Sequence, residues 1–388
     1  MLRRCIQICL LTTLGLIVVV VCLLARIPNS ITTFFLDRSV NVPDWSPDGY
    51  RIAFACHFPS LRQVWENQRA LLDYGFVCEA LEICAADIDG GNFVRLTNNA
   101  VRDDLPSWSP NGQQIAFVSK RDGKAAVYLM DKEGKQVVKL PSPSGRGIGE
   151  PTWSPDGLQI CFSAENPSRP DQYADLYLVD LSSRELHSLT EFSGAEWIPR
   201  WSPDGAKIAF IWYPYESSIH DAALRLISPD GSDDKVLVKD FRGFVDLAWS
   251  PDGRQLAFIG SQTPDKAAIY VVNISNGSLL RLTDEHDMSA VTGNITWTPD
   301  GSHITFIDAP PGMTSDVFSI RPDGSGLFRI TDSQDLEGSL FLVMFGQHLT
   351  WSPDGKHLAF VRMEHKSSKE HIWIVDSDGS NPRKLKVP

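Results

Sequence analysis

Trp201-Ser-Pro-Asp-Gly205, followed after two residues by Ile208-Ala-Phe210, is the stretch of sequence that decides the fold. Close copies of both pieces recur along the chain, and the spacing between successive copies is 45 to 63 residues. A unit repeated at such a period indicates a repeat architecture in which each unit packs on its neighbours. The seven copies begin at Trp45, Trp108, Trp153, Trp201, Trp249, Trp297 and Trp351.

Each part of this unit has a physical reason. Ser, Pro, Asp and Gly suit the four positions of a type I turn, because proline presets φ and glycine accepts the left-handed conformation that closes a short hairpin. The strand that follows alternates large, small and large side chains, as in Ile52-Ala-Phe54, which favours a strand packed on both faces. The small middle residue leaves room for a neighbouring sheet.

Two further strands complete each unit. Apolar runs such as Leu176-Tyr-Leu-Val-Asp180 predict a third strand, and endings such as Ser188-Leu-Thr190 predict a fourth. Four antiparallel strands form a propeller blade, and seven blades close into a ring around a channel without leaving an open array of edges. The predicted fold is therefore an all-β, seven-bladed β-propeller over residues 41–388.

The first 27 residues differ from the rest of the chain. Residues 5–25 carry no charged side chain and would reach roughly 31 Å as a helix, enough to cross a bilayer core. We therefore expect an N-terminal transmembrane helix, a signal anchor within residues 1–27, and a linker at 28–40. Arg3 and Arg4 predict a cytoplasmic N-terminus and an extracytoplasmic propeller. A cleaved signal peptide and an apolar tail of another origin are the alternatives.

The net charge of the chain limits the classes of partner that it is expected to bind. It carries 36 Lys and Arg residues against 48 Asp and Glu residues, a formal net charge of −12. Such a body lacks the basic surplus that neutralises phosphates, and an anionic lipid surface would repel it. We expect no nucleic-acid partner, and contact with a membrane only through residues 5–25.

The repeats resemble a known family. The Trp-Ser-Pro-Asp-Gly and Ile-Ala-Phe pieces look like the WD40-like (PD40) repeats of the TolB-type β-propeller, and the resemblance covers residues 41–388. Bacterial TolB has six blades behind a small α/β domain and partners envelope proteins. This chain has seven units, and only residues 28–40 separate its apolar segment from the first unit. The resemblance therefore implies the propeller fold and does not extend to the role of TolB itself.

No catalytic motif accompanies the repeats. The sequence contains no Gly-x-Ser-x-Gly elbow, His-Glu-x-x-His pair or phosphate-binding loop. We therefore expect a non-catalytic, monomeric scaffold without a cofactor, which binds a protein or peptide in the cell envelope or the extracellular space. The alternative is a channel-centred enzyme, either a metal-dependent lyase or a hydrolase acting on saccharides or peptides.

The channel and the variable loops are the two candidate binding regions. Residues just before each tryptophan are candidates for the channel mouth, and acids predominate among them, which is typical of a site for a cation or a basic peptide segment. A wet channel lined by solvated polar residues is the alternative. The loops between second and third strands vary in length, the longest at about residues 57–80, and varied loops on a rigid scaffold often bind ligands. The channel candidates are Asp44, Asp104, Glu150, Arg200, Asp246, Asn294 and His348. The favoured binding residues are Asp104, Glu150, Asp246, Asn294 and His348.

Three histidines are the candidate metal ligands of the enzyme alternative. Some related propellers are lyases that hold a metal with several channel histidines, and His220, His286 and His348 belong to segments that would face one mouth. Scattered histidines without a spacing rule are more often surface residues, so no metal site is expected in the scaffold interpretation.

Three cysteines fall within the first unit. Cys56, Cys78 and Cys84 flank its long insertion, and in an oxidising compartment one pair is expected to form a disulfide. We predict the Cys56–Cys78 pairing, which would tie the insertion down. Cys161 occupies the small middle position of its strand and is expected in the core.

Overall fold

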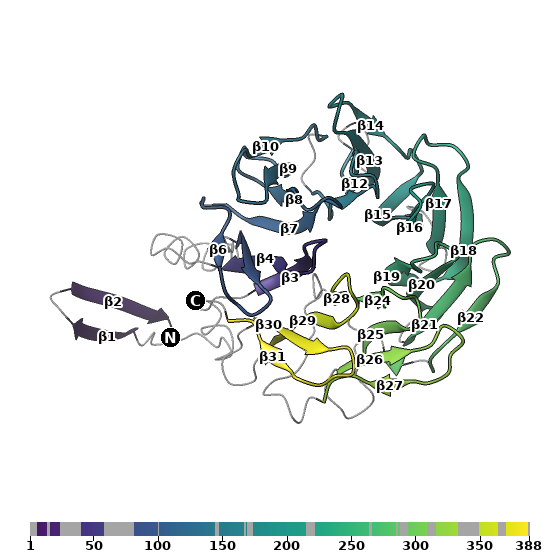
Figure 1. Ribbon diagram of the computed structural model, residues 1–388. Helices are drawn as coiled ribbons and strands as arrows, with labels where there is room; N and C mark the ends of the chain where they lie inside the picture. The colour runs from purple at the N-terminus through teal and green to yellow at the C-terminus, as the bar shows by residue number, and fades with distance from the viewer. Residues whose placement is uncertain are drawn as a thin grey trace, which may run out of the picture.

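Seven blades surround a central channel in the computed structural model of the chain (Figure 1). Each blade contains four consecutive antiparallel strands, which run in chain order from the channel to the rim, and one blade adds a fifth short strand. Every regular element among the described residues is a strand, so the predicted all-β, seven-bladed propeller is confirmed. The structure describes residues 6–13, 16–23, 40–57, 81–99, 101–143, 147–166, 168, 174–214, 222–263, 266–284, 286–287, 294–308, 316–332, 349–363 and 370–386.

The first four blades contain strands β3 to β18. Blade 1 consists of β3 (Val40–Trp45), β4 (Arg51–His57), β5 (Leu81–Asp87) and β6 (Val94–Arg95). Blade 2 consists of β7 (Asp103–Trp108), β8 (Gln114–Ser119), β9 (Ala126–Asp131) and β10 (Val138–Lys139). Blade 3 consists of β11 (Thr152–Trp153), β12 (Gln159–Ala164), β13 (Asp175–Asp180) and β14 (Leu186–Ser188). Blade 4 consists of β15 (Gly194–Trp201), β16 (Ile208–Pro214), β17 (Ala222–Ile227) and β18 (Lys235–Phe241).

The last three blades contain strands β19 to β31. Blade 5 consists of β19 (Gly243–Trp249), β20 (Gln255–Ser261), β21 (Lys266–Asn273) and β22 (Leu279–Arg281), and the short β23 (His286–Asp287) also pairs with β21. Blade 6 consists of β24 (Ile295–Trp297), β25 (Ile304–Asp308), β26 (Asp316–Ile320) and β27 (Phe328–Arg329). Blade 7 consists of β28 (Thr350–Trp351), β29 (His357–Met363), β30 (Glu370–Asp376) and β31 (Arg383–Lys384).

The apolar N-terminal segment departs from the expectation. Strands β1 (Ile6–Thr13) and β2 (Leu16–Leu23) pair antiparallel in a sheet of their own, so the expected transmembrane helix is not found. Among the residues that the structure describes, no helix is long and apolar enough to cross a membrane. The residues from Ile17 to Val21 are all β-branched, and such side chains favour strands over helices.

Each Trp-Ser-Pro-Asp-Gly segment forms the hairpin between the first and second strands of its blade. In blade 5 the Ser250 hydroxyl donates to Asp252 Oδ1 at 2.7 Å and accepts the Gln255 amide at 2.9 Å. Asp252 Oδ1 also accepts the Arg254 amide at 3.0 Å. Gly253 has a φ of 70°, the left-handed conformation that the sequence predicted for this position. The turn is therefore held by its own side chains.

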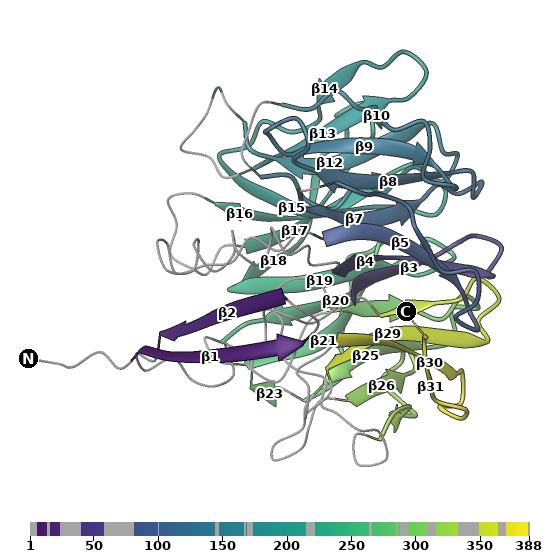
Figure 2. The same ribbon diagram turned by 90° about the vertical axis from the view of Figure 1, so that its left-hand side faces the viewer.

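The seven turns also contact one another around the ring. A Cβ on Gly253 would lie 3.7 Å from Pro203 Cδ, which belongs to the turn of the preceding blade. Gly49 of blade 1 makes the same contact with Pro353 of blade 7, so the circle closes. Figures 1 and 2 both show blade 1 beside blade 7. The remaining pairs are Gly112 with Pro47, Gly157 with Pro110, Gly205 with Pro155, Gly301 with Pro251, and Gly355 with Pro299.

The core consists of apolar clusters between neighbouring blades. Leu256 and Phe258 of blade 5 are buried against Ala209, the small middle residue of the matching strand in blade 4. Cys161 fills the same position in blade 3 and is buried in the cluster that it shares with blade 4, as predicted. The indole Nε1 of Trp249 donates to the Arg200 carbonyl at 3.0 Å, which also links blade 5 to blade 4. The large-small-large pattern is therefore the pattern of sheet-on-sheet packing.

Blade 1 contains a disulfide between Cys56 and Cys84. The predicted partner of Cys56, Cys78, lies outside the described residues, and the Cys56–Cys78 pairing is wrong. Cys56 and Cys84 lie on the adjacent strands β4 and β5, where Cys84 pairs with Phe54, two residues from Cys56. Their Cα atoms are 6.1 Å apart, within the usual range for a disulfide.

Candidate functional site

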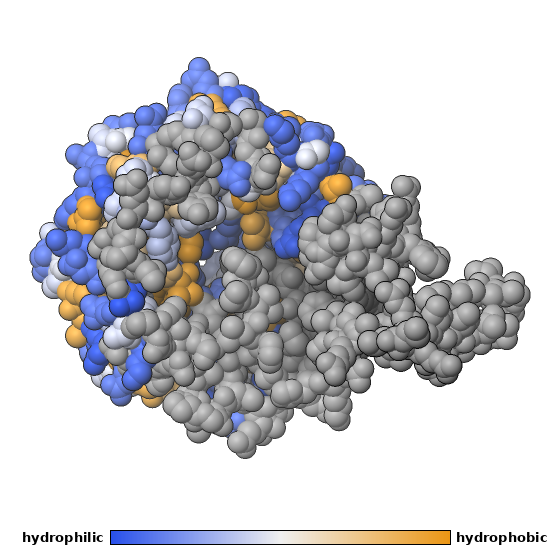
Figure 3. Space-filling view, turned by 180° about the vertical axis from the view of Figure 1, so that it is seen from behind, coloured by the Kyte–Doolittle hydropathy of each residue, from blue (hydrophilic) through white to orange (hydrophobic). Residues whose placement is uncertain are grey.

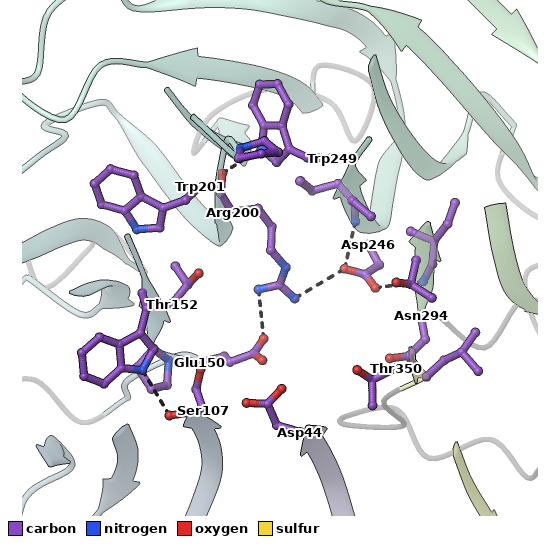
Figure 4. Close-up of a pocket in the computed structure, with 18 of the residues that line it drawn as sticks. Asp44, Ser107, Glu150, Thr152, Arg200, Trp201, Asp246, Trp249, Asn294 and Thr350 are labelled. Atoms are coloured by element: carbon purple, nitrogen blue, oxygen red, sulfur yellow. Dashed lines mark hydrogen bonds and ion pairs between the residues drawn. The ribbon is translucent and has the colours of Figure 1, made fainter. Parts of the chain in front are cut away.

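The channel encloses a cavity of about 350 Å³ that is lined by the innermost strands of the blades. Figure 3 shows the hollow at the centre of the ring from behind, and Figure 4 shows the residues around it. The lining runs from Glu150, Asp246 and Asn294 to the turn prolines Pro155 and Pro203. Polar side chains therefore meet at the axis of a rigid ring.

The alternation of side chains along a strand explains which residues reach the cavity. Residues one and three positions before a tryptophan lie on the same face of the innermost strand. Asp44 and Arg200 occupy the first of these positions, and Glu150, Asp246 and Asn294 occupy the second. All five line the cavity.

Arg200 lies between two carboxylates from the neighbouring blades. Its Nη1 is 3.0 Å from Glu150 Oε2 of blade 3, and its Nη2 is 3.7 Å from Asp246 Oδ1 of blade 5 (Figure 4). Burial alone would lower the pKa of Arg200, but the Glu150 and Asp246 carboxylates outweigh it and raise that pKa. The guanidinium therefore stays charged and joins three consecutive blades.

Asp44 is the third carboxylate of the cavity. Burial raises its pKa to about 7, and the nearby Glu150 carboxylate adds to the rise. The Trp108 amide donates to Asp44 Oδ2 at 2.7 Å and opposes the shift. Asp44 therefore changes charge near neutral pH, unlike an ordinary aspartate.

Asp246 is fixed by backbone amides. Leu247 N–H donates to its Oδ1 at 2.9 Å, and Ile295 N–H of blade 6 donates to its Oδ2 at 3.2 Å. Asn294, next to this donor, has a φ of 75°, a conformation that asparagine tolerates better than most residues. Asp44 and Asp246 thus each accept a backbone amide of the next blade, which holds both carboxylates toward the axis.

The structure places Asp104 away from the cavity. Asp104 lies four positions before its tryptophan, and a register shift between Asp104 and Ser107 interrupts the strand pairing. Leu105, within that shift, has a φ of 54°. Asp104 is buried against Arg102, whose Nε donates to its Oδ2 at 2.9 Å. Ser107 lines the channel in this blade instead.

The side chains of the three histidines of the metal alternative lie outside the described part of the structure. His220 and His348 lie outside the described residues, and of His286 only the backbone, in β23, is described. Within the described parts of the chain, no group of three or more His, Cys, Asp or Glu side chains is placed to hold a metal ion. Whether His220, His286 and His348 bind a metal ion therefore stays a prediction.

Comparison with known families decides the relationship of the chain. The TolB beta propeller domain family (PD40) matches residues 76–217 and 230–387. The chain belongs to this family. The resemblance noted from the repeats is therefore confirmed, and this TolB-type propeller has seven blades.

Proteins with different named activities are similar to this chain in sequence or in fold. An uncharacterized peptidase, YuxL of Bacillus subtilis strain 168, is 32% identical over 103 residues, which cover 26% of this chain and only 14% of that relative. TolB of Acinetobacter baumannii is 19% identical, with a TM-score of 0.51 over 79% of this chain and 75% of that chain. An oligogalacturonate lyase of Vibrio parahaemolyticus is 14% identical, with a TM-score of 0.64 over 88% and 90%. These two structural likenesses concern the fold alone.

A ring of turn aspartates accompanies the channel of this TolB-type propeller. In six of the seven turns the aspartate has a lowered pKa, first because the Ser or Thr hydroxyl of the same turn donates to it. These carboxylates therefore stay ionised well below neutral pH. They are Asp48, Asp156, Asp204, Asp252, Asp300 and Asp354, and Asn111 takes the seventh position.

The sequence predicted the candidates of this TolB-type channel but not their contacts. The bridge from Arg200 to Glu150 and Asp246 depends on three strands from different blades, and no local pattern reports it. The alternation of side chains along the strand favours Ser107 over Asp104, because the polar side chains upstream of a tryptophan that line the cavity lie one or three positions before it. The same alternation predicts Thr152 and Thr350, which also line the cavity.

Proposed function

We propose that this protein is a non-catalytic binding platform whose channel takes a cationic group of a protein or peptide partner. The observation that carries the proposal is the convergence of three carboxylates and one guanidinium on one cavity in the ring. The carboxylates of Asp44, Glu150 and Asp246 outnumber the guanidinium of Arg200. When Asp44 is ionised, these four groups leave a net charge of −2 in the cavity, which favours a cationic ligand.

The side of Glu150 that faces Asp44 is the position that we assign to this charge. Arg200 contacts Glu150 and Asp246, whereas the interaction between Asp44 and Glu150 is repulsive and raises the pKa of Asp44. A lysine ammonium or an arginine guanidinium near both would convert that repulsion into attraction and lower the pKa of Asp44. Binding would therefore release a proton from Asp44 near neutral pH.

The size of the cavity selects the kind of ligand. A volume of about 350 Å³ lies at the low end of the range for small-molecule sites. It suits one side chain or a short extended segment, and the rest of a partner would rest on the face of the ring. The ionised turn aspartates favour the approach of a basic segment.

We also place the propeller outside the cytoplasm, as a monomer in the cell envelope. The disulfide in blade 1 supports an oxidising compartment, and the uncharged residues 5–25 support contact with a membrane. Protease added to intact cells tests the placement. Loss of an epitope at the C-terminus agrees with it, and full protection of that epitope contradicts it.

Calorimetric titration with an acetylated, amidated tetralysine peptide tests the binding proposal. Glu150→Gln removes a carboxylate from the cavity and is expected to weaken binding at least tenfold. Asp104→Asn is the matched control, because Asp104 is a buried carboxylate that does not line the cavity, and it is expected to bind as the wild type does. Equal affinities of all three proteins would contradict the proposal.

Metal content separates this proposal from the enzyme alternative. The fold likeness to an oligogalacturonate lyase makes the control worthwhile. Protein purified without chelator is expected to carry no stoichiometric transition metal by mass spectrometry. A bound metal that His220→Ala and His348→Ala abolish would favour the metal-dependent lyase instead.

A further inference from the structure

One interface of the ring differs from the other six in its connectivity. Among the strands that the structure describes, every blade is built from its own consecutive strands, so blade 7 (β28 to β31) meets blade 1 (β3 to β6) with no exchanged strand. The chain runs directly from one blade to the next at the other six interfaces, whereas Trp45 and Thr350, which are in contact here, lie 305 residues apart in the sequence. Contacts between segments so far apart cost more chain entropy to close, and the least connected contact is expected to open first.

Buried side chains and an indole hydrogen bond join blades 1 and 7 at this seam. Trp45 Nε1 of blade 1 donates to the Thr350 carbonyl of blade 7 at 3.1 Å. Ile52 and Phe54 are buried in one cluster with Ala359 of blade 7. Large side chains of one blade thus pack on a small residue of its neighbour, as they do between blades 4 and 5. The described part of the seam is thus packed like its counterparts, without the direct chain connection that they have.

The disulfide lies on the face of blade 1 that forms this seam. Side chains alternate along β4 and β5, and Ala53 and Ile83 face the cluster shared with blade 2. Cys56 and Cys84 face the other way and belong to the cluster with Val361, Ile372 and Ile374 of blade 7. The two cysteines are 1% and 0% exposed. The cross-link is therefore buried within the seam itself.

We propose that the Cys56–Cys84 disulfide is the lock of ring closure, so that its reduction lets the seam open while the other interfaces stay packed. The reductant is a dithiol such as dithiothreitol. It supplies two electrons and two protons, the Sγ–Sγ bond breaks, two thiols form, and the dithiol becomes a cyclic disulfide. The thiols must then separate within a close-packed cluster, which loosens β4 and β5 against β29 and β30.

Hydrogen exchange of the full chain, read by mass spectrometry, tests this lock. In the Cys56→Ala/Cys84→Ala double variant, amides of β3, β4, β29 and β30 are expected to exchange at least tenfold faster than in the wild type. Amides of β16 and β20, at the opposite side of the ring, are expected to keep their rates. Cys161→Ala is the matched control, because it removes a buried sulfur from the interface of blades 3 and 4 and leaves the seam intact.

Folded wild-type protein treated with dithiothreitol gives the second measurement, which does not require the variant to fold. Faster exchange confined to the seam supports the lock. Acceleration spread evenly over all seven blades overturns it, because the disulfide would then stabilise the protein only as a whole. Unchanged seam exchange, with reduction verified by alkylation of both cysteines, also overturns it.

Discussion

Asp44 and Asp48 lie four residues apart, on either side of the same tryptophan, yet their carboxylates are shifted in opposite directions. The Ser46 hydroxyl is the main cause that lowers the pKa of Asp48 in the turn, and burial in the channel is the main cause that raises the pKa of Asp44 to about 7. The turn supplies its own donors, whereas the channel gathers acids from several blades. The same residue type is thus structural in one region and available for binding in the other.

This contrast holds around the whole ring. Five other turns repeat the Asp48 arrangement almost unchanged, and each of the six is complete within one hairpin. The channel positions immediately upstream carry aspartate, glutamate, arginine, asparagine, serine and threonine. Uniform positions therefore hold the fold, and varied positions on the same strands determine what the channel can bind.

The largest expected effect lies on the structural side, between the blades. Phe258→Ala removes a fully buried ring from the cluster of blades 4 and 5 and is expected to lower the free energy of unfolding by about 3–5 kcal/mol. Phe328, which is 41% exposed on β27, is the control, and Phe328→Ala is expected to change it by less than about 0.5 kcal/mol. Chemical denaturation measures both, and similar losses would contradict the assignment of the core.

The second-largest expected effect is that Asp44 and Asp48 change the stability of the protein in opposite directions as the pH changes. Between pH 4 and pH 7 the native state holds a proton on Asp44 that the unfolded state has lost, so stability falls as the pH rises through this window, by roughly 3 kcal/mol in total. Asp44→Asn is expected to remove this fall. Asp48→Asn instead removes a carboxylate with a lowered pKa, so its stability loss is expected above pH 4 and should vanish in acid. Denaturation at a series of pH values measures both, and parallel profiles would contradict the contrast.

A smaller effect is expected within the turns. Ser250→Ala removes the hydroxyl that links Asp252 to the Gln255 amide and is expected to cost about 1 kcal/mol of stability. Ser250→Thr keeps a hydroxyl, as Thr298 does in blade 6, and is expected to retain most of the stability. Neither variant is expected to change the affinity for the tetralysine peptide. A loss of affinity at constant stability would show that the turns take part in binding.

The smallest effect concerns the residue that follows each turn glycine. Leu158 is 57% exposed, and the matching positions carry Tyr50, Gln113 and Ala206. Leu158→Ser is expected to change the free energy of unfolding by less than about 0.5 kcal/mol. A larger loss in a thermal or chemical melt would mean that this position also holds the turn.

The division between the two regions also explains how much the sequence revealed. The turn and the Ile-x-Phe strand are local, so seven copies sufficed to predict the blades, their number and the burial of Cys161. Asp104 was misplaced because it lies four positions before Trp108, whereas the polar side chains upstream of a tryptophan that line the channel lie one or three positions before it. The bridge at Arg200 depends on three blades at once. Such contacts follow from the assembled ring and not from any single repeat.

Two further expectations failed for a related reason. Hydropathy measures how apolar residues 5–25 are but does not separate helix from strand, and the β-branched residues of β2 favour the strand. Cys78 seemed a natural partner for Cys56 because both flank the insertion. The pairing of β4 with β5 brings Cys84 into reach instead.

A crystal structure of the protein with the tetralysine peptide tests the central claim most directly. The account predicts an ammonium group of the peptide in the channel, within hydrogen-bonding distance of Glu150 and beside Asp44. Peptide bound only at the rim or on the loops, with the channel free of it in crystals grown at neutral pH, would contradict the account.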